Sequence, residues 1–187
     1  MFFYADHMTA QIRFFITVLL AGFAFTANGL AAPPTEIGKF KSWRVYELGS
    51  GAGKICYILS QPVKKYPRNV RRGEIFMSVT HRPAQKVRHE VSIRIGYPFS
   101  GESNPYAQIG ADNFAFFTGA KMGEASSAWA WLENPQQHDR MMGSMRRGNE
   151  LVFKGTSSRG TLTTDHYSLL GFTAALNKIN EACPETP

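Results

Sequence analysis

The chain has 187 residues, 43% of them hydrophobic, and carries a formal net charge of +7. This length corresponds to a single domain. The two cysteines do not form a Cys-x-x-Cys pair, which argues against thiol-exchange chemistry.

Residues 1–32 contain the three parts of a secretory signal peptide. Arg13 supplies a positive charge, an apolar run follows over residues 14–25, and small residues precede a cleavage position near Ala31 or Ala32. The apolar run is too short to span a bilayer, which takes about 20 residues. We therefore predict a signal peptide over residues 1–32, a single mature domain over residues 33–187 and no transmembrane span after signal removal. An N-terminal core helix is the weaker alternative.

Export would place both cysteines in an oxidising compartment. Cys56 and Cys183 lie in the predicted mature domain, and an even number of cysteines there favours a disulfide. This bond would join an early strand to the last helix and, in the chain-entropy model, contribute about 4–5 kcal/mol to stability. Two separately buried thiols are the alternative. The signal peptide predicts an exported protein.

The predicted mature domain begins with a leader and a hairpin. Residues 32–39 contain prolines and are expected to be flexible, whereas residues 42–48 and 54–60 predict two antiparallel strands. The glycine-rich turn between the strands is superficially similar to a phosphate-binding loop. Leu48, however, stands where that motif needs its first glycine, and Ile55 where it needs Ser or Thr. We therefore predict a turn, and no nucleotide or other cofactor.

Residues 61–73 contain two prolines and five basic residues, and predict an exposed loop. The basic residues of this loop are Lys64, Lys65, Arg68, Arg71 and Arg72. Residues 64–94 hold nine basic residues against two acidic ones, so the positive charge of the chain is concentrated there. On an exported protein this suggests an anionic lipid, lipopolysaccharide or a polyanionic sugar as partner, and it disfavours nucleic acid. A basic surface without a specific ligand is the alternative.

Further strands are predicted between residues 74 and 132. Residues 74–81 and 87–95 alternate with period two, and residues 106–109 and 113–118 are two short strands around a turn. His81 and His89 have no partner at metal-ligand spacing, so we predict no metal site. Residues 128–132 predict a strand with Trp129 and Trp131 on one face, and we expect this pair to pack in the core.

Two helices are predicted in the last third of the chain. The first begins with Asn134 as its N-cap, followed by Pro135, and ends at Gly148. The second carries an apolar stripe with spacings of three and four residues. The residues of this stripe are Leu169, Phe172, Leu176, Ile179 and Cys183. We expect Asp165 or Ser168 to cap this second helix.

Residues 159–167, between the two helices, predict a strand rich in polar side chains. The site candidates on one of its faces are Arg159, Thr161, Asp165 and Tyr167. Because Asp165 and His166 point to opposite faces of a strand, they do not form the simplest acid–base dyad, and we predict no catalytic residue. The alternative is a periplasmic hydrolase in which His166 acts with Ser157 or Ser158.

The strand number, the frequent turns and the late helices predict a mainly β, antiparallel β-sandwich with a short helix and a C-terminal amphipathic helix. The motif Lys154-Gly155-x-Ser157-x-Arg159-Gly160-Thr161, followed by Asp165, Tyr167-Ser168-Leu169 and Gly171-Phe172, resembles the invasion-associated locus B family of exported alphaproteobacterial proteins. Trp43, Cys56 and the run Gly96-Tyr97-Pro98-Phe99 extend this resemblance over residues 40–183. The resemblance implies an immunoglobulin-like sandwich that is periplasmic, outer-membrane-associated or secreted. It also implies an association with host-cell invasion and no established catalysis.

These features together predict a non-enzymatic protein of the cell envelope or of the secreted fraction. We expect it to bind an anionic envelope component, or an envelope or host protein. A purely structural envelope protein and the hydrolase are the alternatives.

Overall fold

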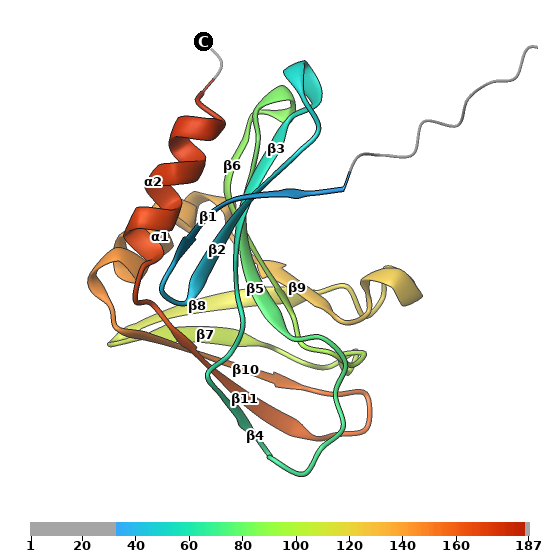
Figure 1. The fold of residues 1–187 in the computed structure, drawn as a ribbon. Coiled ribbons are helices and arrows are strands. Elements are labelled where there is room, and N and C mark those ends of the chain that lie inside the picture. Colours follow the sequence, from blue (N-terminus) through green and yellow to red (C-terminus); the bar gives the residue numbers. More distant parts are fainter. Residues whose placement is uncertain (1–32, 186–187) are drawn as a thin grey trace, which may run out of the picture. The chain divides into compact units, whose positions relative to one another are not determined.

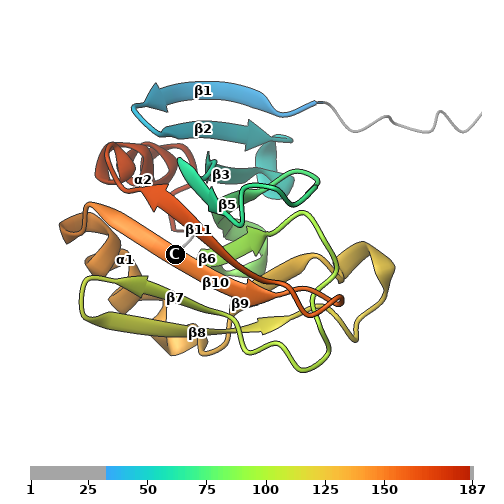
Figure 2. The same cartoon turned by 90° about the horizontal axis from the view of Figure 1, so that it is seen from below.

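A computed structural model describes residues 33–185 (Figures 1 and 2), so the predicted signal peptide lies outside the described residues. The strands are β1 (Thr35–Phe40), β2 (Trp43–Leu48), β3 (Ile55–Ser60), β4 (Lys64–Tyr66), β5 (Phe76–Arg82), β6 (Val87–Arg94), β7 (Tyr106–Ile109), β8 (Asp112–Thr118), β9 (Trp129–Leu132), β10 (Glu150–Thr156) and β11 (Leu162–Ser168). The helices are α1 (His138–Arg147) and α2 (Phe172–Ala182).

The described strands form one antiparallel sheet in the order β1-β2-β3-β5-β6-β9-β8-β7-β10-β11-β4. Strand β8 joins its two halves, because the first part of β8 pairs with β7 and its last three residues pair with β9. The sheet folds over at this shared strand, so that the two halves enclose a common core (Figure 1). The predicted antiparallel β-sandwich is therefore confirmed, with the difference that both layers belong to one continuous sheet.

The apolar stripe of α2 packs against the half of the sheet formed by β1, β2 and β3 (Figures 1 and 2). Phe172, Leu176 and Ile179 are fully buried, as their spacing predicts. The ring of Trp43 on β2 meets Phe172 edge to face at 5.1 Å, and its indole N–H donates to the Ser168 carbonyl at 3.1 Å. This tryptophan therefore fixes the start of α2 against the sheet.

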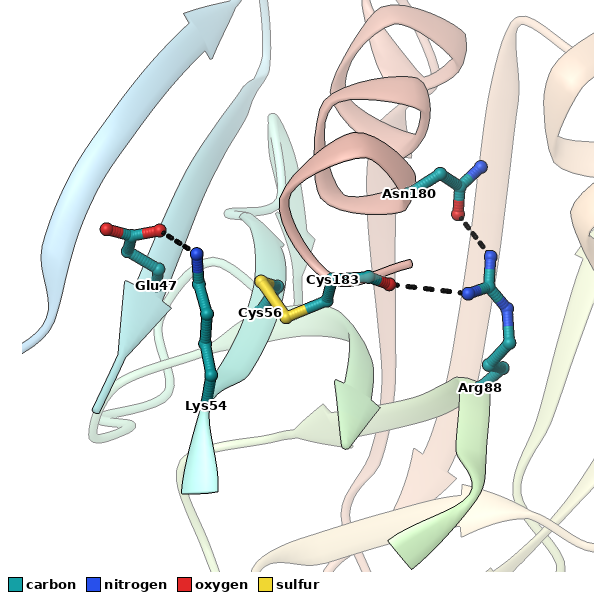
Figure 3. Close-up of a disulfide and its surroundings, with 6 residues drawn as sticks. All are labelled: Glu47, Lys54, Cys56, Arg88, Asn180 and Cys183. Carbon is teal, nitrogen blue, oxygen red and sulfur yellow. Dashed lines mark hydrogen bonds and ion pairs between the residues drawn. A yellow bond between two sulfur atoms is a disulfide. The ribbon is translucent and has the colours of Figure 1, made fainter. Parts of the chain in front are cut away.

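A disulfide between Cys56 on β3 and Cys183 joins the C-terminal end of α2 to the sheet (Figure 3). The two Cα atoms are 6.0 Å apart, and the predicted pairing is confirmed. Beside it, Arg88 of β6 donates to the Asn180 side-chain oxygen at 2.9 Å and to the Cys183 carbonyl at 3.4 Å (Figure 3). The end of α2 is thus held covalently to β3 and by hydrogen bonds to β6.

Two segments that the sequence predicts as irregular are strands. Residues 35–39 of the predicted flexible leader, together with Phe40, form the edge strand β1, with Ile37 and Phe40 packed against the core. Residues 64–66, predicted as part of an exposed loop, form β4 at the opposite edge and pair with β11. Neither segment has the regular apolar alternation that identifies a strand, because edge strands gain much of their order from backbone pairing.

Three details of the later elements also differ from prediction. Strand β11 begins at Leu162, so Arg159 and Thr161 lie in the turn before it. Helix α2 begins after Gly171, whose positive φ of 90° ends the preceding segment, and no side chain caps the helix. Asp165 is three residues inside β11 and fully buried, which rules it out as a cap.

The expectation that Trp129 and Trp131 pack in the core is wrong. On β9 the buried residues are Ala130 and Leu132, while both indoles are partly exposed on the outer face of the sheet. Strand alternation fixes only that the two tryptophans share a face. On the core side of β9, Ala130 and Leu132 lie opposite the buried Ile93 and Phe116.

Candidate functional site

The basic loop is anchored to the polar strand by a buried ion pair between Arg72 and Asp165. Both terminal nitrogens of Arg72 donate to the Asp165 carboxylate at 2.6 Å, and the two side chains are 5% and 0% exposed. The Arg72 Nε donates to the Ile95 carbonyl at 2.9 Å, and the guanidinium lies 5.0 Å from the centre of the Tyr97 ring. Arg72 therefore holds the loop in place, and only 5% of its side chain is exposed.

The electrostatics of this pair follow from its burial. Loss of solvent raises the pKa of Asp165, while the hydrogen bonds and positive charge of Arg72 oppose that rise. Burial also raises the pKa of Tyr97, and that of Tyr167 well above its ordinary value. Tyr167 is fully buried, and its hydroxyl has no hydrogen-bond partner among the described residues. Asp165 and Tyr167 are thus interior groups beneath the loop.

The other four basic residues of the loop are exposed. Lys64, Lys65, Arg68 and Arg71 form no ion pair with a carboxylate in the described part of the chain. Lys64, Lys65 and Arg68 line a hollow of about 320 Å³, whereas Arg71 lies outside its lining. The backbone N–H of Val63 donates to the His166 carbonyl at 2.7 Å, so β4, which carries Lys64 and Lys65, is fixed to β11.

A second hollow of about 520 Å³ shares Val63 with the first and extends the positive charge toward β1 and β2. Lys39, Lys41 and Arg44 line it, and only Arg44 has an ion pair among the described residues, with Glu36 at 2.8 Å. Sequence reasoning missed Lys39 and Lys41, because they lie in the predicted leader or just after it, outside the basic stretch. The cationic surface consists of Lys39, Lys41, Arg44, Lys64, Lys65 and Arg68.

The residues of the hydrolase alternative lie apart in the structure. Val152 pairs with His166, and Ser157 is five residues farther along the chain, or about 16 Å along an extended strand. The Ser157 hydroxyl accepts a hydrogen bond from the Thr161 N–H at 3.1 Å. His166 lies instead 3.1 Å from a Glu150 carboxylate oxygen and against the Tyr66 ring. The structure does not bring a serine hydroxyl to this histidine.

A separate cluster of titratable side chains surrounds His81 near the disulfide. The His81 ring is fully buried and lies 5.1 Å from the His89 ring, and His89 contacts Asp139 at 2.8 Å. Burial, followed by the charges of Arg88 and His89, lowers the pKa of His81 to about 3. Neither ring nitrogen makes a hydrogen bond of standard geometry, although the nearby Cys183 backbone slightly favours protonation. In residues 33–185 no three His, Cys, Asp or Glu side chains are arranged to hold a metal ion.

The fold and this surface define a disulfide-closed β-sandwich with an exposed cluster of cations. The chain belongs to the invasion associated locus B (IalB) protein family, whose model matches residues 43–180. No curated protein and no solved structure matches the chain significantly. Family membership and the disulfide indicate an exported protein of a family linked to invasion. In the described residues no helix is long and apolar enough to cross a membrane.

Proposed function

We propose that this protein is a non-enzymatic exported protein that binds an anionic component of the cell envelope through the cationic surface. The observation that carries the proposal is that five cations without an ion pair among the described residues line two adjoining hollows. These five are Lys39, Lys41, Lys64, Lys65 and Arg68. Positive charges left unpaired around a concavity attract anions more strongly than the same charges spread over a convex surface.

The rigidity of the surface supports the same proposal. Because Arg72 is bound to Asp165 and β4 is paired with β11, the backbone that carries Lys64 and Lys65 is already ordered before a ligand binds. Preorganisation of this kind lowers the entropic cost of association.

A host or envelope protein with an acidic surface would contact the same cations. The hydrolase alternative has less support, because Ser157 and His166 lie apart.

The test measures binding of the purified exported protein to lipopolysaccharide and to vesicles that contain phosphatidylglycerol. We expect binding to weaken roughly tenfold or more as NaCl is raised from about 50 to about 500 mM, since exposed charges are screened over this range. Vesicles of phosphatidylcholine alone should not bind. Binding that is absent, or indifferent to salt, would contradict the proposal.

The variant Lys64→Glu/Arg68→Glu should abolish this binding. The matched control, Lys121→Glu/Arg146→Glu, makes the same change in net charge at two exposed cations outside the cationic surface. If the control variant loses as much affinity as the first, the protein attracts anions only through its overall charge. A specific role for the cationic surface would then be untenable.

A further inference from the structure

The outer face of the sheet carries a groove of about 440 Å³ over β3, β5, β6 and β9. Its shape follows from one row of paired residues across these strands. Leu59 pairs with Ser78, Ser78 with Ser92, and Ser92 with Trp131. Two small side chains therefore lie between two large ones, and the serine hydroxyls form a polar floor, 2.8 Å from each other.

Flat aromatic rings form one wall of this groove. The indoles of Trp129 and Trp131 are inclined by only 17°, with centroids 6.3 Å apart, and Phe117 continues the row at 5.5 Å from Trp131. Phe76 closes one end of the groove against Trp129. Trp129 and Trp131 are partly exposed and line the groove, so they offer it flat apolar surface on which the weakly positive C–H groups of a sugar ring can pack.

The opposite end of the groove is polar. Arg82 and Glu90 form a close ion pair there, both 25% exposed, and Thr80, which pairs with Glu90, lies between Arg82 and Ser78 on β5. Guanidinium and carboxylate groups supply several donors and acceptors in fixed directions, which suits adjacent sugar hydroxyls. An acyl chain in the groove would instead strip water from this ion pair without replacing its hydrogen bonds.

An extended peptide fits this face less well than a saccharide. Strands β3, β5, β6 and β9 are all paired on both sides, so the groove offers no free backbone edge to which a peptide strand could add. Recognition here depends on side chains alone, namely flat rings, hydroxyls and one ion pair.

The groove is continuous with the cationic surface. It shares Leu59 with the hollow lined by Lys39, Lys41 and Arg44, and the stacked rings of Tyr46 and Tyr57 lie across the boundary. The charged residues of the groove itself are paired, so the unpaired positive charge begins beyond Leu59. An elongated ligand that lies across this boundary would contact the aromatic rings and hydroxyls of the groove at one end and the lysines of the cationic surface at the other.

We propose that the ligand of this protein is an acidic oligosaccharide, with pyranose rings on the aromatic groove and its anionic groups on the cationic surface. The anionic part of this inference rests on the proposed function, whereas the groove adds the saccharide. The ligand is thereby specified as a polyanion that carries sugar rings.

The test compares four probes by calorimetry and tryptophan fluorescence. Heparin hexasaccharide and hexagalacturonate are acidic oligosaccharides, whereas polyphosphate and polyglutamate of similar charge have no sugar rings. We expect at least one oligosaccharide to bind roughly five- to tenfold more tightly than either ring-free polymer and to change the tryptophan emission.

The variants separate the two parts of the surface. Trp131→Ala should weaken oligosaccharide binding by a similar factor and leave polyphosphate unaffected, whereas Trp131→Phe should restore most of the affinity. If Trp131→Ala does not fold, Phe117→Ala is the second variant, since that ring is 43% exposed. Lys64→Glu/Arg68→Glu should weaken the binding of all four probes.

The possible failures are distinguishable. Equal binding of all four probes, with no effect of the Trp131 variants, would overturn the saccharide inference and leave the anion-binding function intact. Tryptophan-dependent binding of polyglutamate alone would assign the groove to a peptide. Absence of binding by every probe at low salt would overturn both proposals.

Discussion

His81 gives the interior a dependence on pH. Its pKa of about 3 in the folded protein lies below the ordinary value of 6.5, so the unfolded chain takes up the proton first as pH falls. The stability that depends on neutral His81 is complete above pH 6.5 and is lost on acidification toward pH 3. Burial dominates this shift, and the adjacent Arg88 and His89 add to it.

We expect His81→Phe to reduce the acid sensitivity of the protein. Between about pH 7.5 and about pH 5, wild type should lose about 2 kcal/mol of unfolding free energy through this histidine, and the variant should not. Urea denaturation at the two pH values measures the difference. His166→Gln, which removes a partly exposed histidine, is the control. Equal acid-induced losses in wild type and His81→Phe would contradict the assignment.

The Arg72–Asp165 pair predicts a large effect from a small substitution. Asp165→Asn leaves a buried guanidinium without its counterion and should lower the unfolding free energy by about 3–5 kcal/mol. Replacing both residues, as in Arg72→Met/Asp165→Leu, should recover most of this loss. Denaturant unfolding gives both values. As a control, Glu74→Gln breaks the exposed Arg94–Glu74 pair and should cost less than about 1 kcal/mol. An Asp165→Asn cost in that same small range would show that the pair is not buried in solution.

At the residue scale, the sequence predicts which side chains share a face but not which ones meet. Alternation correctly places Asp165 and Tyr167 together, away from His166. The partner of Asp165 lies 93 positions away in a loop with no regular pattern, so no local signal identifies it. The prediction for the tryptophans of β9 is wrong for a related reason, since alternation does not specify which face of a strand is buried.

At the scale of elements, α2 and β3 are joined by both packing and a covalent bond. We expect Cys56→Ala/Cys183→Ala to lower the unfolding free energy by about 4 kcal/mol, because the disulfide closes a loop with a sequence separation of 127. The buried stripe of α2 should preserve the far-UV circular dichroism of the native fold. Denaturant unfolding of both proteins checks the value.

The presence of the bond itself is checked by intact mass with and without reductant, which should differ by two hydrogens. Unchanged stability in the double variant would mean that packing alone determines the position of α2.

The helices are well predicted because a stripe, a proline and a glycine mark them in the sequence. The edge strands β1 and β4 are not predicted, because they are ordered by backbone pairing with β2 and β11 and have no apolar alternation of their own.

At the scale of the molecule, the cationic surface could be predicted only in part. Its loop residues are visible as a run of charge, whereas Lys39 and Lys41 join it because the fold places β1 and β2 beside the start of β4. The aromatic groove has no local signature at all. It needs four strands in register, and only the sequence-distant pairing of Ser92 with Trp131 reveals it.

The order of the sheet gives the lysines of the cationic surface a second consequence. Across the sheet, β1 is the first strand and β4 is the last, so these two strands form the open edges of the sheet. They carry Lys39, Lys64 and Lys65. Lysine on an edge strand discourages a second molecule from adding its own strand there. The charges that we propose to bind a polyanion would therefore also disfavour edge-to-edge association of two copies of the protein. We expect a ligand that neutralises these lysines to reduce this repulsion and so to favour self-association through the sheet edges.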